Sequence, residues 1–158
     1  DVSKVQVMAE MFAYNNFFDR DLSMWDTSNV KNMFGMFEFS SYDGDISGWD
    51  TSNVETMSCM FYESKEFNGD ISKWDVSKVK DFSKMFMHAH KWNSDITKWN
   101  TSSAETMDSM FEQSNFCQDI SHWNVDRVKT RRHCFVLSNM PYDGEYEPKF
   151  KVPNEWWK

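Results

Sequence analysis

The 158-residue sequence lacks the features on which membrane-spanning proteins and many enzymes depend. No apolar run approaches the roughly 18 residues that cross a bilayer, and no basic and apolar leader is present. We expect no transmembrane segment here, and any secretion signal or anchor to lie outside this fragment. Only five Gly occur, and there is no Gly-rich phosphate loop, HExxH or GxSxG motif. These absences predict a protein that is not an enzyme and needs no cofactor.

Cysteine and concentrated positive charge are scarce as well. The three cysteines, Cys59, Cys117 and Cys134, are odd in number and show no C-x-x-C spacing, so they indicate no disulfide framework. The formal net charge of −8 repels a phosphate backbone, and most Lys and Arg residues are dispersed. Nucleic acid is therefore not expected as a partner.

Leu is almost absent, whereas 12 Met, 14 Phe and 8 Trp are present, and the Trp residues recur at a fixed period. A Trp followed by Asp or Asn recurs every 24 or 25 residues, at Trp25, Trp49, Trp74, Trp99 and Trp123. A fixed period in this range predicts a solenoid. The expected units are 1–25, 26–49, 50–74, 75–99 and 100–123, with a degraded sixth unit at 124–138 and a C-terminal cap or tail at 139–158.

The pattern after each Trp predicts a short helix. Ser28 stands at the N-cap position. The apolar residues Val30, Met33, Met36 and Phe37 follow at i, i+3, i+6 and i+7, which is one face of a helix. Met is an adaptable filler between stacked units, so we expect the Met and Phe positions to form the core.

The segment D-[IL]-[ST]-x-W in each unit is typical of a strand. It is too short for a helix and places one aliphatic residue between polar neighbours, at residues 21–25, 45–49, 70–74, 95–99 and 119–123. One strand and one helix per unit predict an α/β repeat solenoid.

Two stretches show a resemblance to a known family, "MFEFSSYDGDISGWDTSNVETMSCMF" and "MFYESKEFNGDISKWDVSKVKDFSKMF". They resemble the repeats of the BspA-like surface proteins, also catalogued as DUF285, over residues 1 to about 138. The resemblance implies a leucine-rich-repeat-like solenoid with a parallel sheet along one side, no enzyme activity, an extracellular or cell-surface location, and a role in adhesion or protein contact. The last unit departs from the pattern at Arg131 and Cys134, and we expect Trp156 and Trp157 to cover its open end or to contact another chain.

Two ladders of polar residues at the outward strand positions are the candidate binding site. The acidic ladder consists of Asp21, Asp45, Asp70, Asp95 and Asp119. The hydroxyl ladder consists of Ser23, Ser47, Ser72, Thr97 and Ser121. Like charges side by side are destabilising unless a counter-group compensates them. Three alternatives remain open: backbone N–H groups of the adjoining turn, a row of Ca²⁺ ions at Asp45, Asp70 and Asp95, or an adhesive face for hydroxyl-rich ligands.

The residue before each repeated Trp varies, and varied positions are where repeat proteins recognise partners. The candidates here are Lys73, Lys98 and His122, which correspond to Met24 and Gly48 in the earlier units. The Trp ladder itself either packs in the core or offers flat faces to sugar rings.

Three functions follow as hypotheses. The first is a non-enzymatic surface protein that binds a protein or a glycan and mediates adhesion. The second is a structural subunit that self-assembles within a capsid, sheath or cytoskeletal array. The third is a Ca²⁺-stabilised carbohydrate-binding module.

Overall fold

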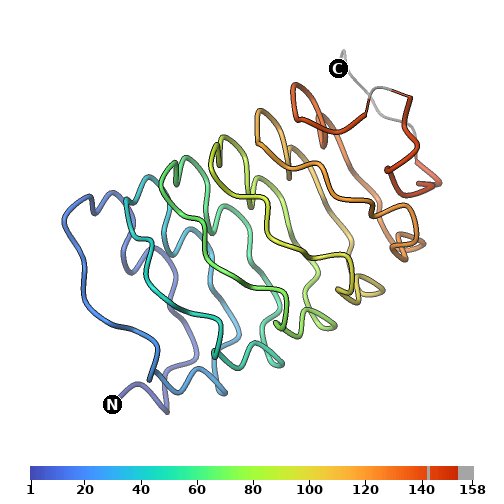
Figure 1. The fold of residues 1–158 in the computed structure, drawn as a ribbon. Helices are drawn as coiled ribbons and strands as arrows, with labels where there is room; N and C mark the ends of the chain where they lie inside the picture. The colour runs from blue at the N-terminus through green and yellow to red at the C-terminus, as the bar shows by residue number, and fades with distance from the viewer. Residues whose placement is uncertain (142, 153–158) are drawn as a thin grey trace.

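The computed structural model describes residues 1–141 and 143–152, and within them the chain winds into coils stacked from the N-terminus to the C-terminus (Figure 1). Single-residue parallel bridges join neighbouring coils. They run from Val7 to Asn32, Asn32 to Thr56, Thr56 to Asp81, Asp81 to Thr106 and Thr106 to Thr130. The bridged residues lie 24 or 25 positions apart, which is also the period of the Trp residues.

The predicted α/β solenoid with one helix and one strand per unit is wrong. The described residues contain no helix, and their only sheet-like residues are the isolated bridges at 7, 32, 56, 81, 106 and 130. The segment expected to be helical forms overlapping β-turns instead. In the second coil, the N–H groups of Met36, Glu38 and Ser40 donate to the carbonyl three residues earlier, at 3.3, 3.0 and 3.1 Å.

Bonds between coils explain why the helix does not form. In a helix almost every N–H bonds four residues back. Here alternate N–H groups donate to the next coil, from Met33 to Thr56 at 3.1 Å, and likewise from Gly35, Phe37 and Phe39 at 2.9, 2.9 and 2.8 Å. Successive N–H groups therefore alternate between closing a turn and donating to the next coil. These bonds between coils replace the hydrogen bonds that a helix would make.

The segments expected to be strands are turns as well. Oδ1 of Asp45 accepts the N–H of Ser47 at 2.9 Å, and the N–H of Trp49 donates to the carbonyl of Ile46 at 3.2 Å. The Asp side chain thus holds the chain in an Asx turn, which competes with an extended backbone. Ser28 is not a helix cap either, because its N–H and hydroxyl both donate to Asp26, at 3.1 and 2.6 Å.

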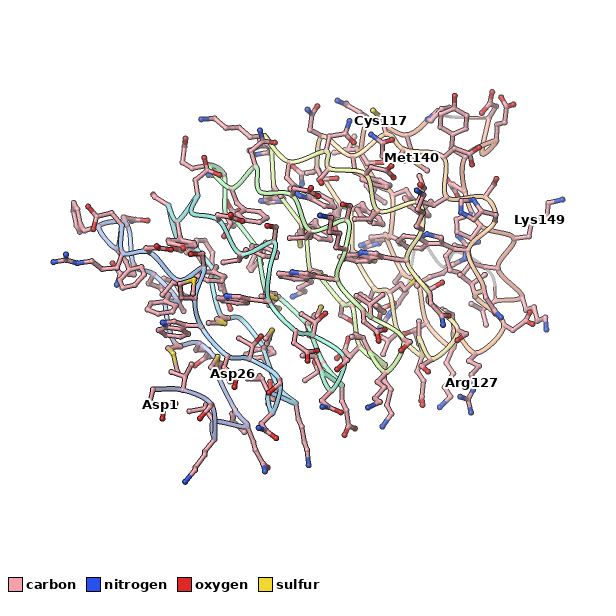
Figure 2. All side chains as sticks on the ribbon, turned by 60° about the horizontal axis from the view of Figure 1, so that its bottom comes forward. Asp1, Asp26, Cys117, Arg127, Met140 and Lys149 are labelled. Carbon is pink, nitrogen blue, oxygen red and sulfur yellow. The ribbon has the colours of Figure 1, made fainter. Side chains whose placement is uncertain are left out.

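The predicted core is confirmed although the backbone is not helical. Val30, Met33, Met36 and Phe37 are at most 1% exposed. Equivalent side chains form rows along the stack (Figure 2), and the Phe rings of one row lie 5.6 to 5.8 Å apart from Phe12 to Phe135. Met11 differs from the other Met positions because it is 42% exposed.

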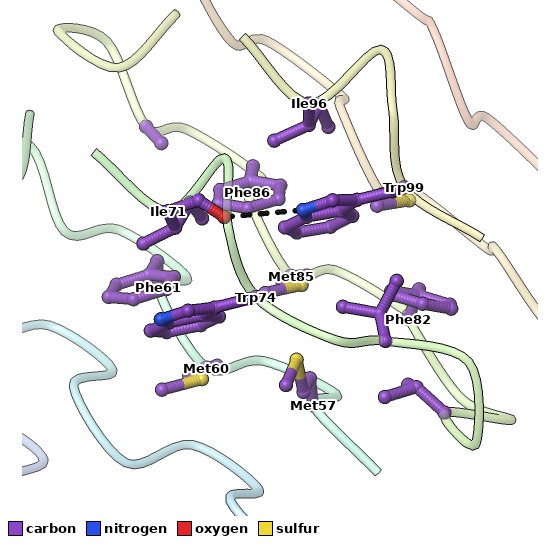
Figure 3. Packing of buried hydrophobic residues seen from close by; sticks show 14 of the residues in the cluster. Met57, Met60, Phe61, Ile71, Trp74, Phe82, Met85, Phe86, Ile96 and Trp99 are labelled. Carbon is purple, nitrogen blue, oxygen red and sulfur yellow. Dashed lines mark hydrogen bonds between the residues drawn. The ribbon is translucent and has the colours of Figure 1, made fainter. Parts of the chain in front are cut away.

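The repeated Trp residues pack in this core, which was one of the two alternatives that the sequence predicted for them. Trp49, Trp74, Trp99 and Trp123 are 3 to 5% exposed. Figure 3 shows Trp74 and Trp99 among Met and Phe side chains, with the indole N–H of Trp99 directed at the carbonyl of Ile71. Buried faces of this kind are closed to a sugar ring.

Residues within 143–152 contact the last coils. The N–H of Ile120 donates to the carbonyl of Tyr146 at 3.1 Å, and Nε of Arg131 donates to the carbonyl of Val152 at 3.0 Å. The guanidinium of Arg131 also lies 4.6 Å from the centre of the Phe150 ring. The predicted capping contacts of Trp156 and Trp157 lie outside the described residues.

Candidate functional site

Each carboxylate of the acidic ladder is bonded inside its own turn. Its Oδ1 accepts the N–H of the hydroxyl residue two positions on, at 2.8 to 3.0 Å. The pairs are Asp21 with Ser23, Asp45 with Ser47, Asp70 with Ser72, Asp95 with Thr97, and Asp119 with Ser121. The first of the three alternatives for the counter-group is therefore confirmed: it is the N–H of the adjoining turn.

These turn bonds lower the pKa of every carboxyl in the acidic ladder. For Asp45 and Asp70 the backbone N–H of the turn is the larger cause and the hydroxyl the second. For Asp21, Asp95 and Asp119 the hydroxyl is the larger cause. The charges of neighbouring ladder carboxylates act in the opposite direction on Asp45 and are a smaller influence.

The ladder does not gather its carboxylates into a metal-binding group. Within residues 1–141 and 143–152, no three His, Cys, Asp or Glu side chains are placed to hold a metal ion. Lys73, Lys98 and His122 are exposed beside the ladder, and Nε2 of His122 lies 2.7 Å from the carbonyl oxygen of Thr97. The predicted site is thus an exposed row of small local turns.

A second set of residues, which the sequence pattern does not reveal, forms a more promising surface. Each coil contains two residues with a positive φ, four positions apart, within the turns that replace the helix. The first left-handed column is Glu10, Gly35, Cys59, Lys84, Ser109 and His133. The second left-handed column is Tyr14, Phe39, Glu63, His88, Gln113 and Leu137. Together these columns form what we call the left-handed face.

The turn geometry imposes the left-handed backbone. Gly35 is the third residue of the turn that Met36 closes, and Phe39 is the third residue of the turn that Ser40 closes. A type II turn requires a positive φ at this position, where Gly is the usual residue. Only Gly35 meets that preference, so eleven of the twelve positions carry a side chain in a conformation that costs an L-residue roughly 1–2 kcal/mol.

Three surface depressions lie along the left-handed face. The largest, of about 370 Å³, is lined in part by Tyr14, Phe39 and Glu63 of the second column. A depression of about 270 Å³ is lined in part by Gln113 and Leu137. The third, of about 250 Å³, is lined by Lys84, Asp108, Ser109, Arg132 and His133.

Aromatic rings form one wall of the largest depression. The Tyr14 and Phe39 rings are stacked with their centres 4.9 Å apart, and Phe39 meets Tyr62 edge-on at 5.0 Å. Tyr14 is 68% exposed. Oγ of Ser41 donates to Oδ1 of Asn16 at 3.2 Å on the same depression. The wall therefore combines apolar ring surface with neutral hydrogen-bonding groups.

Charged groups of both signs form the rest of that depression. Glu63 pairs with Lys65 at 3.0 Å and bonds to Nδ1 of His88, while Glu66 pairs with Lys91. Burial raises the pKa of Glu63, but the hydrogen bonds from Lys65 and His88 outweigh it and hold the pKa below its ordinary value. Glu63 is therefore an ionised, oriented acceptor at neutral pH.

Glu38 behaves in the opposite way. Burial and then the nearby charge of Glu10 raise its pKa, although the Tyr14 hydroxyl donates to Oε1 at 3.5 Å. Two carboxylates with different proton affinities thus flank the aromatic wall.

Cys134 takes no part in this surface. It is fully buried, as its alignment with a core Met position predicts, and burial raises the pKa of its thiol. A buried, protonated thiol is a poor nucleophile.

The bridged residues of neighbouring coils thus recur every 24 or 25 positions. Residues 1–47 and 38–140 match the family described as "Mycoplasma protein of unknown function, DUF285". Because the match covers most of the chain, the protein belongs to the DUF285 family. No curated protein and no solved structure matches it significantly. In the described part of the chain no helix is long and apolar enough to cross a membrane.

Proposed function

We propose that the protein is a non-enzymatic, BspA-like protein of the cell surface or extracellular space, which makes adhesive contacts with a protein or a glycan. The left-handed face supports this proposal most directly. Glycine at its positions would remove the backbone strain, yet eleven of the twelve retain a side chain. Strained residues that persist are concentrated at functional sites. The side chains therefore have a role that outweighs their cost to the fold.

The chemistry of the second left-handed column suits recognition rather than packing. Its six side chains are a phenol, a phenyl ring, a carboxylate, an imidazole, an amide and an isobutyl group. The core rows, in contrast, repeat the same residue types from coil to coil. A row of varied side chains on a regular scaffold presents a specific pattern to one partner.

The left-handed backbone permits a test that separates binding from folding. A triple variant, Phe39→Gly, Glu63→Gly and His88→Gly, removes three side chains of the second column and relieves their backbone strain. Binding is measured on immobilised glycans and extracellular matrix proteins. We expect the variant to fold and to lose at least about tenfold in affinity for any ligand that the unmodified chain binds, as for the loss of central contacts.

The matched control is Asp45→Asn, Asp70→Asn and Asp95→Asn, which keeps the turn acceptor and removes three charges of the acidic ladder. We expect it to bind normally. Binding that survives in the triple Gly variant and disappears in the Asn control would transfer the site to the acidic ladder. A chain that binds nothing and is found inside the cell would refute the adhesive role.

A structural subunit of a larger assembly is the second candidate, and one observation favours it. Five of the six large apolar residues exposed in the described chain belong to residues 7 to 24. Size-exclusion chromatography over a hundredfold range of concentration tests self-assembly, and a constant monomer would count against it.

A further inference from the structure

The third depression on the left-handed face gathers basic side chains, although the net charge of the protein is −8. Its volume is about 250 Å³, and it is lined by Lys84, Asp108, Ser109, Arg132 and His133. Three of these residues are consecutive members of the first left-handed column and come from three successive coils. The proposed function, which uses the second left-handed column, gives them no role.

The carboxylate that lines this depression is already compensated. Oδ2 of Asp108 accepts Nε and Nη2 of Arg132 at 3.2 and 2.8 Å, and Oδ1 accepts the backbone N–H of the same Arg at 2.7 Å. Charge-assisted bonds to both carboxylate oxygens fix the two side chains against each other. Glu112 lies 3.9 Å from Nδ1 of His133 and does not line the depression. An anion in the depression therefore meets no uncompensated carboxylate from its lining.

Lys84 differs from Arg132 because no carboxylate of the described residues forms an ion pair with it. Its Nζ lies 5.9 Å from the centre of the Tyr62 ring, and its side chain is exposed. Its backbone is left-handed, with a φ of 57°, and its N–H donates to the carbonyl of Asp108 at 2.8 Å. A positive charge that lacks a counter-ion in a depression raises the local concentration of anions.

The groups around Lys84 indicate which kind of anion fits. The hydroxyl of Ser109 and the imidazole of His133 can hydrogen-bond to an oxyanion. The half-buried Tyr62 ring meets Phe39 edge-on at 5.0 Å and offers an apolar surface beside the ammonium, which suits a sugar ring. A long polyanion would be repelled by the net charge of −8. These features favour one acidic group on a short glycan.

We propose that the third depression binds the oxyanion group, a carboxylate or a sulfate, of a short acidic glycan. The ammonium of Lys84 pairs with the anion, and Ser109 and His133 hydrogen-bond to its oxygens. The sugar ring that carries the acidic group lies toward Tyr62. This inference rests on the adhesive function proposed above, and it assigns a chemical class to the glycan and a binding site outside the second left-handed column.

Titration of the whole chain with small sugars tests the proposal. The probes are sialyllactose, which carries a carboxylate, sulfated lactose and neutral lactose, and binding at low salt is followed by NMR shifts of the backbone amides. We expect an acidic sugar to bind at least about tenfold more tightly than neutral lactose, as for a hydrogen bond to a charged group. The tighter of the two acidic sugars identifies the acidic group. The largest shifts should occur at the amides of Ser109 and His133.

Variants of Lys84 locate the site. Lys84→Gln removes the charge from an exposed side chain and should weaken binding of the acidic sugar at least about tenfold. Lys84→Arg keeps the charge and should weaken it less than about threefold. Lys98→Gln is the matched control, because it removes the same charge beside the acidic ladder, and it should bind normally.

Equal affinity for neutral and acidic lactose, or equal losses in Lys84→Gln and Lys98→Gln, would overturn the proposal. If neither acidic sugar binds while the chain still binds a matrix protein or another glycan through the second left-handed column, the anion site is refuted and the adhesive function stands. If binding depends on Lys84 in a protein that is found inside the cell, the adhesive function is refuted and the anion site stands.

Discussion

The indole Nε1 of Trp74 donates a hydrogen bond to the carbonyl oxygen of Ile46, in the coil before it, at 3.1 Å. The same bond joins Trp99 to Ile71 at 3.2 Å. Both Trp side chains are buried, so each bond is protected from water and ties one coil to its predecessor. Trp123 stands in the equivalent place, but its Nε1 is buried without a hydrogen-bond partner in the described chain.

Replacing Trp74 by Phe tests the contribution of this bond. Trp74→Phe leaves the buried carbonyl of Ile46 without its donor and creates a small cavity, so we expect a loss of about 2–4 kcal/mol in the free energy of unfolding. Trp123→Phe is the matched control, since it removes a similar volume and no hydrogen bond. Its loss should be smaller by roughly 1 kcal/mol. Urea denaturation measures both, and equal losses would contradict the assignment.

The core could be predicted from the sequence because burial depends on side chains. Apolar residues recur in most units at the places of Val30, Met33, Met36 and Phe37, and these four side chains are buried. Their spacing does not distinguish a helix from consecutive turns, because both return a side chain to the same side after three or four residues. The choice between them is made by hydrogen bonds to the next coil, such as that from Met33 to Thr56. A local pattern carries no information about such bonds.

Gly35 provides a test of the left-handed backbone. Its φ is +56°, and an added Cβ would lie 2.9 Å from Oε2 of Glu38 and 3.3 Å from Cγ of Glu10. Gly35→Ala should therefore lower the free energy of unfolding by about 1–2 kcal/mol. Gly48→Ala is the matched control, because nothing lies within 4 Å of its added Cβ. Its effect should stay within about 0.5 kcal/mol. A larger loss for Gly48→Ala would refute this account.

The left-handed face could not be predicted from the sequence for a related reason. Glycine is the usual signal of a positive φ, and of the twelve positions only Gly35 carries it. The others, such as Tyr14 and His88, are residue types that carry no sequence signal of a positive φ. The sequence pattern indicated the acidic ladder instead, because Asp recurs there without exchange. The structure explains this recurrence, since each Asp accepts a hydrogen bond from its turn.

The acidic ladder predicts a loss of stability in acid. The folded-state pKa of each ladder carboxyl lies below its unfolded value, so the stabilisation is present above about pH 4 and is lost as the pH falls through the folded pKa. We expect the urea midpoint to decrease from pH 5 to pH 3. In the variant Asp45→Asn, Asp70→Asn and Asp95→Asn, the decrease should be smaller, since three acceptors no longer titrate. An identical decrease would assign the acid sensitivity to other groups.

Calcium is tested by melting the protein with and without a chelator. Each ladder carboxylate is already bonded to its turn, and no metal-binding group is found in the described residues. We therefore expect the same Tm in excess EDTA as in Ca²⁺ at about 1 mM, a concentration that fills weak extracellular sites. A Tm that falls in EDTA and recovers with Ca²⁺ would restore the row of cations at Asp45, Asp70 and Asp95.

A row of alternating charge runs along the stack and predicts a salt-dependent stability. Its members are Lys31, Glu55, Lys80, Glu105 and Lys129. Each backbone N–H in the row donates to the previous coil, as from Lys80 to Glu55 at 2.9 Å, so the side chains lie side by side. Nζ of Lys80 is 2.8 Å from Oε2 of Glu55, and Lys129 pairs with Glu105.

Lys80→Glu would place three carboxylates next to one another in this row, and like charges in neighbouring positions repel. We expect a lower Tm in low salt and a partial recovery in about 0.5 M NaCl, because these exposed charges are screened. Lys4→Glu makes the same change of net charge on an exposed side chain outside the row, and should leave the Tm nearly unchanged. If the Tm decreases equally in both variants, the cause is net charge rather than the alternation of Lys and Glu along the coils.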